Sequence, residues 1–224
     1  MDTEKLEKQA VSILSALGKN CGCVVIFEED KTYIVPIYGD FDLQFAFANN
    51  GVNGRDVLRS LNNLLILKGY NEPFEENILI DIRNSLCFVS EDLDREYREY
   101  KKNHRKIAER EEGYYLNNEK CISFSYIERT IVCECLFRSP VLEGEIHSTR
   151  IKLQNVIIDA ISKVNSDIQE ALYENIILTG TLSTLKGLKE RLIKEIIKQI
   201  PIEGQPPRRK FTKINVILTS DLIK

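Results

Sequence analysis

The sequence predicts an α/β protein with one or two domains, and three observations support this prediction. Hydrophobic patterns typical of strands alternate with patterns typical of helices, and the helical ones are long enough to cover a sheet. The chain of 224 residues can bury a substantial core. Its 43% hydrophobic and 29% charged residues are typical of a globular protein and not of a disordered one.

The charge balance and the length of the apolar runs exclude several other classes. Lys and Arg number 31 against 34 Asp and Glu, and the net charge of −3 gives no overall basic field for nucleic acid or an anionic membrane. The longest apolar runs, residues 21–27 and 64–67, are far shorter than the roughly 20 residues that span a bilayer. Because the N-terminus is polar and unlike a signal peptide, we expect a soluble protein of the cytoplasm or nucleus with reduced cysteines.

The first part of the chain is predicted to form a helix followed by a β-hairpin. Apolar residues recur at helical spacing within residues 3–17, and Gly18 can end this helix. The apolar runs at 23–27 and 32–38 flank a short polar E-E-D-K tip, which is the pattern of two antiparallel strands. Pro36 predicts either an edge position or a bulge for the second strand, because proline cannot donate to a sheet ladder.

The next segments are predicted to form a β-rich stretch, a loop and two helices. The stretch LQFAFA at residues 43–48 continues the β pattern, and the Asn-Asn-Gly after it favours a loop over residues 49–54. Residues 56–68 have a helical pattern, which Gly69 can end. A second helix is expected over residues 73–89, since its proline suits a first turn.

The middle of the chain is expected to combine a surface helix with a β-hairpin. Residues 91–112 are almost entirely polar and carry oppositely charged pairs one helical turn apart. This pattern predicts a solvent-exposed helix held by weak surface pairs, and a partner-binding arm is the alternative. Residues 114–135 return to β character, with a hairpin tip at Asn117 and Asn118.

The last part of the sequence again alternates between helix and strand patterns. A helix is predicted over residues 151–173, a short apolar strand over 176–180 and an amphipathic helix over 183–198. The prolines of QPPRRK predict a rigid turn before a last strand, KINVIL, at residues 213–218. The prediction of the α/β class is therefore based on the alternation of helix and strand patterns along the whole sequence.

Motifs of common enzymes and metal sites do not occur in the sequence. It has no P-loop, no dinucleotide-binding glycine motif and no zinc-protease motif, and neither histidine lies in a nucleophile motif. Two C-x-C pairs, Cys21 with Cys23 and Cys133 with Cys135, could together supply four thiolates to zinc. Alternate residues of a strand point to opposite faces, so these cysteines are better explained as small core residues.

Five segments resemble, in order, the second half of an actin-family chain. They are QAVSILSALG, VPIY followed by NGRDV, DIRNSLCFVSEDLDRE, LYENIILTGTLSTLKGLKERLIKEI and QPPRRK. The resemblance implies an actin-like fold (actin/Hsp70/hexokinase-type), of which this chain has only the second half. It also implies a larger α/β lobe from residues 1–52 and 139–224, and a smaller helical/β lobe, residues 53–138, inserted in it.

The resemblance further implies a cleft for ATP between two hairpins, whose glycines let backbone N–H groups approach the phosphates. Here the aligned hairpin, residues 26–30, has no glycine and carries three carboxylates. One carboxylate ~5 Å from a phosphate charge opposes binding by roughly 3 kcal/mol at an effective dielectric of about 20. An exposed hairpin tip is the simpler interpretation of these residues, and the family's first phosphate hairpin has no counterpart in this sequence.

Several positions of the family's cleft are nevertheless retained by resemblance. The candidate cofactor-binding residues are Gly54, Asp56, Gly180, Lys210 and Arg83. Of these, Arg83 is a departure, because Arg83 and Asn84 replace the family's Lys-Glu pair over the adenosine. Gln9 matches the glutamine that orients the attacking water, whereas Thr181 replaces the second of two glycines beside the phosphates. A β-branched side chain there removes the close backbone approach that glycine allows. No residue is assigned a catalytic role or a metal-binding role.

These observations predict a divergent actin-related protein that acts as a non-catalytic structural or interaction subunit and needs no cofactor. We expect a cytoskeletal role in filament nucleation, capping or a motor-adaptor complex. The expected partners are actin or subunits of actin-related complexes, without direct contact with nucleic acid or membrane. Two alternatives remain open: a nuclear subunit of a chromatin-remodelling complex, and an ATP- and Mg²⁺-binding actin-like ATPase whose N-terminal half is missing from this chain.

Overall fold

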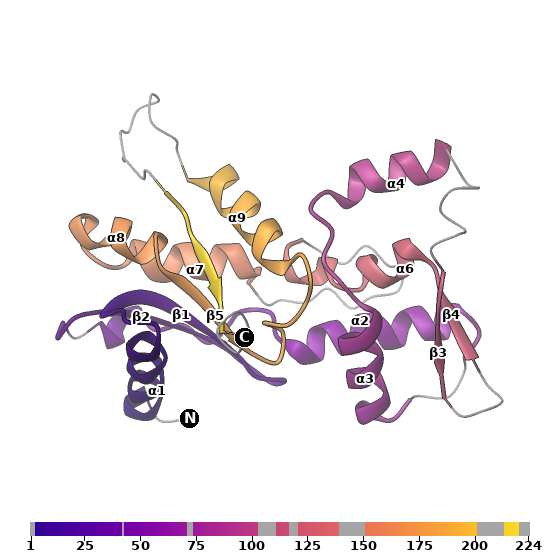
Figure 1. The fold of residues 1–224 in the computed structure, drawn as a ribbon, viewed down its shortest axis with the longest axis horizontal. Helices are drawn as coiled ribbons and strands as arrows, with labels where there is room; N and C mark the ends of the chain where they lie inside the picture. Colours follow the sequence, from indigo (N-terminus) through magenta and orange to yellow (C-terminus); the bar gives the residue numbers. More distant parts are fainter. Residues whose placement is uncertain are drawn as a thin grey trace. The chain divides into compact units, whose positions relative to one another are not determined.

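The computed structural model describes residues 3–41, 43–70, 74–102, 111–116, 121–138, 151–200 and 213–219 (Figure 1). In chain order, its helices (α), 3-10 turns (η) and strands (β) are α1 (Thr3–Ala16), β1 (Cys21–Phe27), β2 (Thr32–Tyr38), η1 (Gln44–Ala46), α2 (Gly54–Leu67), α3 (Glu76–Leu86), α4 (Leu93–Lys102), β3 (Glu112–Tyr115), β4 (Cys121–Phe124), α6 (Tyr126–Ile131), η2 (Glu134–Leu136), α7 (Leu153–Ser162), α8 (Ser166–Tyr173), β5 (Ile176–Gly180), α9 (Leu188–Gln199) and β6 (Val216–Leu218). This mixture of helices and strands confirms the α/β class. None of the described helices is long and apolar enough to cross a membrane.

The chain divides into two compact units. Unit 1 consists of Met1–Gly54, Arg150–Thr184 and Leu192–Lys224, and unit 2 consists of Arg55–Thr149 and Leu185–Arg191. The lobes expected from the sequence assign residues 185–191 to the larger lobe, whereas in the structure these residues cluster with unit 2.

Unit 1 is built on a four-stranded sheet with the strand order β2-β1-β5-β6. The pair β1–β2 is antiparallel, as the sequence predicts for a hairpin, and β5 lies parallel to both β1 and β6. The carboxyl ends of β1 and β5 therefore lie next to each other at one end of the sheet, where Phe27 pairs with Gly180. The candidate site lies at this end of the sheet.

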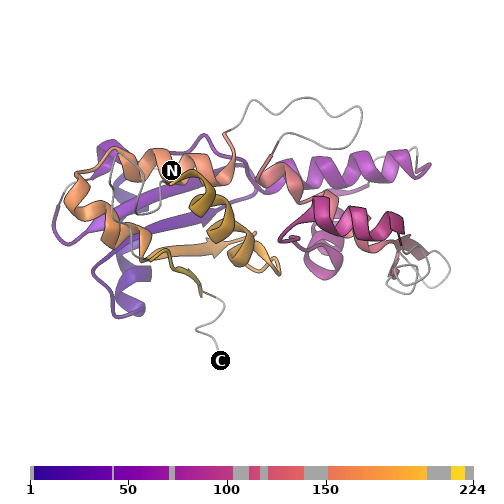
Figure 2. The same ribbon diagram turned by 90° about the horizontal axis from the view of Figure 1, so that it is seen from above.

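Helices cover both faces of this sheet, which explains why its inner strands are apolar at nearly every position. Leu6, Ala10 and Leu14 of α1 pack on one face. The strand residues in the same cluster are Val24, Ile26, Tyr33, Val35, Ile37 and Ile177. Alternate strand residues point the other way, toward α7 and α8, which lie on the side of the sheet opposite α1 (Figure 1). Figure 2 shows these two helices, in orange, over the strands.

Strand β2 is an edge strand, which is one of the two outcomes predicted from Pro36. The register runs without a bulge, with Pro36 opposite Cys23. On its outer side, Ile34 and Ala48 exchange two backbone hydrogen bonds of 2.8 and 3.1 Å. The stretch LQFAFA, expected to be β, instead forms the short turn η1, and only Ala48 at its end reaches the strand. That expectation was wrong because only one residue pairs with β2.

Two helices predicted near the end of the chain differ from those in the structure. The predicted helix 151–173 is two helices, α7 and α8, because the chain turns at Val164, whose carbonyl accepts a 2.8 Å hydrogen bond from Nε2 of Gln169. The helix predicted to begin at residue 183 begins at Leu188, after a turn in which Oγ of Ser183 donates to the Gly180 carbonyl over 2.7 Å. Strand β5 matches the predicted strand at 176–180, whereas β6 covers only the last three residues of the strand predicted at 213–218.

Unit 2 contains the helices α2, α3, α4 and α6, the turn η2 and a two-stranded sheet of β3 and β4. Residues 126–136, expected to be β, instead form α6 and η2, and Ser125 and Glu128 form a capping box at the start of α6. The helix predicted over 73–89 is the shorter α3, which ends at Leu86. Beyond it, the N–H of Val89 donates to the Lys186 carbonyl over 2.8 Å and not to a carbonyl of the helix.

The charged run at residues 91–112 begins as the surface helix that the sequence predicts. The described part of this helix is α4, and its polar side chains are mostly exposed. The remaining residues, 103–110, and the expected hairpin tip at Asn117 and Asn118 lie outside the described residues.

Candidate functional site

The candidate site of unit 1 lies at the carboxyl ends of β1 and β5. In sheets with parallel strands, ligands commonly bind beyond these ends. The E-E-D-K tip, residues 28–31, follows β1 directly, and Gly180 ends β5. Gly54, another residue predicted to bind the cofactor, lies against the same tip. The structure thus brings two of the five predicted residues to one hairpin tip.

The tip is a tight turn without the geometry of an anion-binding loop. The N–H of Glu28 donates to the carbonyl of Lys31 over 2.8 Å, which closes the turn. An anion-binding nest needs successive N–H groups, with one residue in the left-handed region. Among the described residues, only glycines have positive φ, and the tip contains none. Ile26 and Phe27, which precede the tip, are buried strand residues.

The loop that precedes α2 holds the tip in place. Oγ1 of Thr32 donates to the Val52 carbonyl over 2.6 Å, and Nδ2 of Asn53 donates to the Asp30 carbonyl over 2.5 Å. The side chains of Thr32 and Asn53 are fully buried. The expected exposed tip is therefore only half correct: Asp30 is exposed, but the turn around it is anchored to the loop.

The side chain of Glu29 lies directly against Gly54, the first residue of α2. A Cβ atom on Gly54 would overlap Oε2 of Glu29 and lie 3.1 Å from its Cα. Glu29 is half-buried, and the backbone N–H of Gly54 also faces the Glu28 carbonyl at 3.5 Å. A carboxylate group thus occupies the space in front of the glycine that the resemblance assigned to a nucleotide.

Gly180 is required by the packing of the sheet itself. Its φ of +90° is unfavourable for residues with a side chain, and a Cβ atom would overlap the carbonyl oxygen of Phe27. The next N–H, of Thr181, donates to the same oxygen over 2.9 Å. This backbone contact explains Gly180 without any ligand.

The other predicted cofactor-binding residues do not belong to this hairpin tip. Asp56 is buried in unit 2, where its Oδ1 atom pairs with Arg59 at 3.2 Å. Arg83 is a fully buried side chain of unit 2, and its Nε donates to Oδ1 of Asn84 over 3.1 Å. Lys210 lies outside the described residues. Gln9 is exposed on α1.

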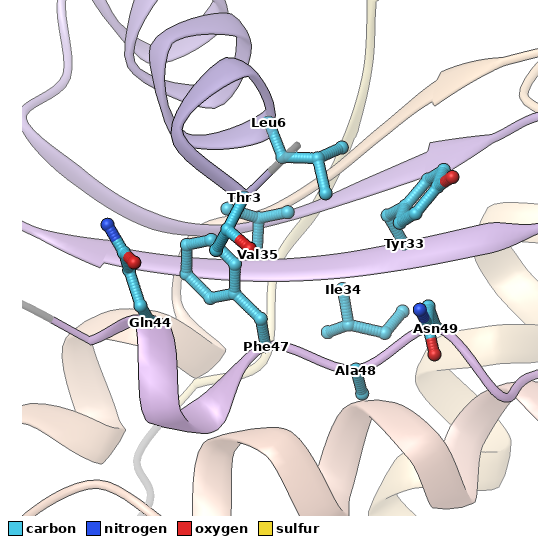
Figure 3. A pocket seen from close by; sticks show the side chains of 9 residues that line it. All are labelled: Thr3, Leu6, Tyr33, Ile34, Val35, Gln44, Phe47, Ala48 and Asn49. Carbon is cyan, nitrogen blue, oxygen red and sulfur yellow. The ribbon is translucent and has the colours of Figure 1, made fainter. Parts of the chain in front are cut away.

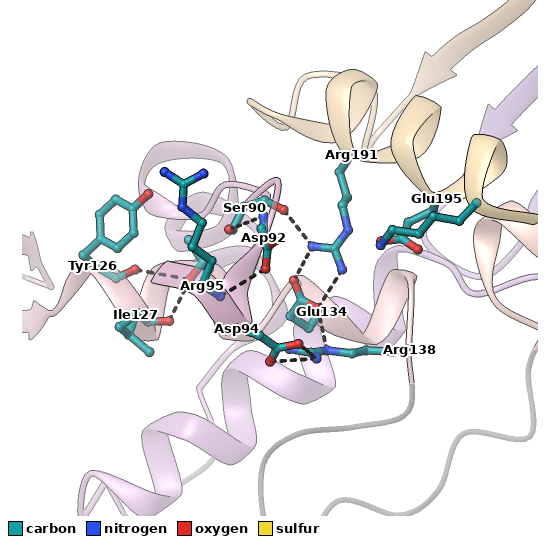
Figure 4. Close-up of polar contacts among 12 residues, drawn as sticks. Ser90, Asp92, Asp94, Arg95, Tyr126, Ile127, Glu134, Arg138, Arg191 and Glu195 are labelled. Carbon is teal, nitrogen blue, oxygen red and sulfur yellow. Dashed lines mark hydrogen bonds and ion pairs between the residues drawn. The ribbon is translucent and has the colours of Figure 1, made fainter. Parts of the chain in front are cut away.

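Unit 2 contains a buried charge cluster that the sequence analysis did not identify (Figure 4). Glu134 pairs with Arg191 through two bonds of 2.9 and 3.2 Å, and with Nε of Arg138 at 2.7 Å. Arg138 also contacts both carboxylate oxygens of Asp94 on α4, at 3.1 and 3.0 Å. The signal for this cluster was a single glutamate within the apolar run IVCECLF, because a buried carboxylate requires a cationic partner.

Three of the buried cysteines are protonated core residues. Burial raises the pKa of Cys23 and of Cys87 to about 12, and it raises the pKa of Cys133 well above its ordinary value. Cys121, in contrast, is exposed. The described residues contain no group of three or more His, Cys, Asp or Glu side chains that could hold a metal ion.

A pocket of about 250 Å³ in unit 1 lies between the start of α1 and β2 (Figure 3). It is lined by Thr3, Leu6, Tyr33, Ile34, Val35, Gln44, Phe47, Ala48 and Asn49. Burial and the charge of Glu28 raise the pKa of Tyr33, so its phenol stays neutral. The lining contains no cluster of charged or nucleophilic side chains.

The doubly covered mixed sheet, with a hairpin tip at the carboxyl ends of its parallel strands, places the chain in the actin-like class of α/β proteins. The family model described as Actin matches residues 4–220. The chain therefore belongs to the actin family, in agreement with the resemblance found in its sequence.

The chain is similar to curated proteins named Actin-related protein 2. It is 34% identical over 218 residues to that of Schizosaccharomyces pombe, covering 93% of this chain and 52% of the relative. It is 33% identical over 214 residues to that of Saccharomyces cerevisiae, covering 93% of this chain and 52% of the relative. It is 32% identical over 190 residues to that of Acanthamoeba castellanii, covering 84% of this chain and 47% of the relative. The sequence stretches LLILKGY, PPRRK and SDLIK favour a resemblance to this subfamily, and the similarity to these relatives confirms it. The chain spans about half the length of the curated relatives it matches.

Proposed function

We propose that this chain is a non-catalytic, nucleotide-independent structural or interaction subunit of a cytoskeletal, cytoplasmic assembly built on actin-related proteins. The observation that carries the proposal is the hairpin tip at residues 28–31. Its turn has no glycine, no positive φ and a carboxylate against Gly54. The similarity to proteins named Actin-related protein 2 supports an assembly of this kind, with actin or actin-related subunits as partners.

The residues of unit 1 do not fit a bound ATP molecule. A phosphate beyond β1 would approach Glu28, Glu29 and Asp30, and each carboxylate at ~5 Å would oppose it by roughly 3 kcal/mol at an effective dielectric of about 20. The backbone offers no nest of N–H groups to offset this repulsion. No hydrolytic step is therefore assigned to Gln9 or to any other residue.

Helix α4 is the surface that we propose as a partner contact. Its side chains Arg95, Tyr97, Arg98, Glu99, Lys101 and Lys102 are exposed, and Leu93 is its buried anchor. The Asp94–Arg138 pair joins the helix to the segment that follows η2. A charged helix held in a defined position can present a specific pattern of charges to a partner, because complementary charges orient an encounter.

Affinity capture of the tagged full chain from cell extract, with and without Mg-ATP, tests the proposal. We expect actin-related subunits to be captured equally in both conditions. Capture that depends on Mg-ATP, or micromolar Mg-ATP binding by isothermal titration calorimetry, would contradict the nucleotide-independent role. Capture of chromatin-remodelling subunits in their place would contradict the cytoskeletal one.

The same capture with variants of α4 tests the contact surface. Arg95 and Glu99 form an exposed ion pair of 3.1 Å, so exchanging both charges in Arg95→Glu/Glu99→Arg preserves the helix but inverts its charge pattern. We expect this double variant to lose partners that the chain retains after Lys163→Glu, a charge reversal on an exposed residue of unit 1. Unchanged capture by the double variant would exclude α4 as the contact.

A further inference from the structure

Glu29 and Gly54 meet at the amino-terminal end of α2, a helix of 14 residues. The first N–H groups of a helix have no partner within the helix, and their aligned dipoles attract negative charge. The carboxylate of Glu29 lies where a side chain on Gly54 would otherwise lie. An anion supplied by the chain itself therefore occupies the end of the helix that would attract an external one.

The surrounding backbone keeps this carboxylate in place. Glu29 lies within the closed turn between Glu28 and Lys31, and Asn53 and Thr32 hold the turn to the loop that leads into α2. The Glu29 side chain therefore cannot leave Gly54 by a movement of the whole tip without breaking buried hydrogen bonds.

We propose that Glu29 is a resident anion: its carboxylate replaces a ligand oxyanion at the start of α2 and keeps the tip closed without nucleotide. This inference rests on the proposed nucleotide-independent function and explains how the chain maintains the region without phosphate. The class of ligand that the carboxylate excludes is an oxyanion, such as the phosphate of a nucleotide or free pyrophosphate.

Hydrogen–deuterium exchange of the full chain measures the effect at the tip. We expect Glu29→Gln, which keeps the shape and removes the charge, to accelerate exchange in peptides that cover residues 52–58 by about two- to five-fold. The acceleration should decrease in 1 M NaCl, because salt screens the charge in the unsubstituted chain. Asp30→Asn is the matched control, since it removes the exposed carboxylate next to Glu29 and should leave this exchange unchanged.

A second pair of variants keeps the test valid if Glu29→Gln does not fold. Glu29→Asp keeps the charge but shortens the side chain, and Gly54→Ala displaces the end of the Glu29 side chain by direct overlap. Both should accelerate exchange at residues 52–58. In Glu29→Gly, 100 mM sodium acetate should restore slow exchange, because a free carboxylate can enter the vacated space, whereas 100 mM NaCl should restore it less.

The outcomes separate this inference from the proposed function. Equal exchange in Glu29→Gln, Glu29→Asp and the unsubstituted chain would overturn the resident anion, even if Mg-ATP has no effect on any of them. Slower exchange of the unsubstituted tip in Mg-ATP or pyrophosphate would also overturn it, because the site would then accept an external oxyanion. Nucleotide-dependent capture of partners, with the expected exchange results intact, would instead contradict only the proposed function.

Discussion

Arg191 and Glu134 form a buried, bidentate ion pair within unit 2. Their side chains are 7% and 1% exposed, and the guanidinium also donates to the Ser90 carbonyl over 2.7 Å. The ring of Phe137 lies 5.0 Å from Cζ of the arginine, in the range of a cation–π contact. The guanidinium of Arg191, in the first turn of α9, thus bonds both the segment before α4 and η2.

Removal of one partner of this pair should be strongly destabilising. We expect Arg191→Met to lower the free energy of unfolding by about 2–3 kcal/mol, because the carboxylate of Glu134 loses its bidentate partner inside the protein and keeps only its bond to Arg138. Urea denaturation followed by circular dichroism measures the change. The double variant Arg191→Met/Glu134→Leu should be less destabilised than the single one. A loss below 1 kcal/mol, as expected for Arg95→Ala at an exposed pair, would show that the buried pair contributes little.

Substitution of Gly180 should destabilise unit 1 through the backbone. Gly180→Ala combines an unfavourable φ of +90° with overlap on the Phe27 carbonyl, so we expect a loss of about 3 kcal/mol or more. Gly39→Ala is the matched control, because Gly39 has a φ of +54° but no atom within 4 Å of the added Cβ. Its expected loss is about 1 kcal/mol. Equal losses in urea denaturation would mean that the close contact with Phe27 is unimportant.

The capping box of α6 should contribute measurably to unit 2. In Ser125→Ala the N–H of Glu128 loses its side-chain acceptor, and we expect unfolding to require about 1 kcal/mol less. Ser123→Ala serves as the control, since its hydroxyl makes only an exposed hydrogen bond with Glu111. Thermal unfolding should show a lower midpoint for Ser125→Ala alone. The prediction fails if the two variants unfold at the same temperature.

The buried thiols should make stability fall at alkaline pH. Burial raises the pKa of Cys23 from 9.0 to about 12, so the unfolded chain loses this proton at a lower pH than the folded chain. The contribution is fully present below pH 9 and is lost as pH rises toward 12, by about 1.4 kcal/mol per pH unit for each such thiol. In urea denaturation from pH 8 to 11, Cys23→Ala should show a shallower decline than the unsubstituted chain. Parallel declines would contradict the raised pKa.

Local patterns were sufficient to predict much of unit 1. Apolar spacing predicted α1, and two apolar runs around a polar tip predicted β1 and β2, because a sheet covered on both faces requires such runs. The same logic failed at residues 126–136, where an apolar run suggested a strand. The capping signal of Ser125 and Glu128 was present there, and it determined the helix.

The candidate site depended on contacts that local patterns do not contain. Glu29 and Gly54 are far apart in the sequence, and they meet only because the loop before α2 docks on the hairpin tip. Arg191 and Glu134 are separated by 57 positions, so neither sequence neighbourhood identifies the partner. The glutamate within IVCECLF needs a cationic partner if it is buried, but only the fold identifies that partner as Arg191.

The outer edge of β2 is poorly suited to pair with an additional strand. Ile34 already exchanges two hydrogen bonds with Ala48, and Tyr38 accepts a bond of 3.1 Å from the N–H of Phe41. Pro36 lies between them on the same edge, since alternate residues share an edge, and it has no N–H to offer. An additional strand would therefore find no continuous ladder along β2. This edge of the sheet therefore resists edge-to-edge aggregation without needing a charged residue on the strand.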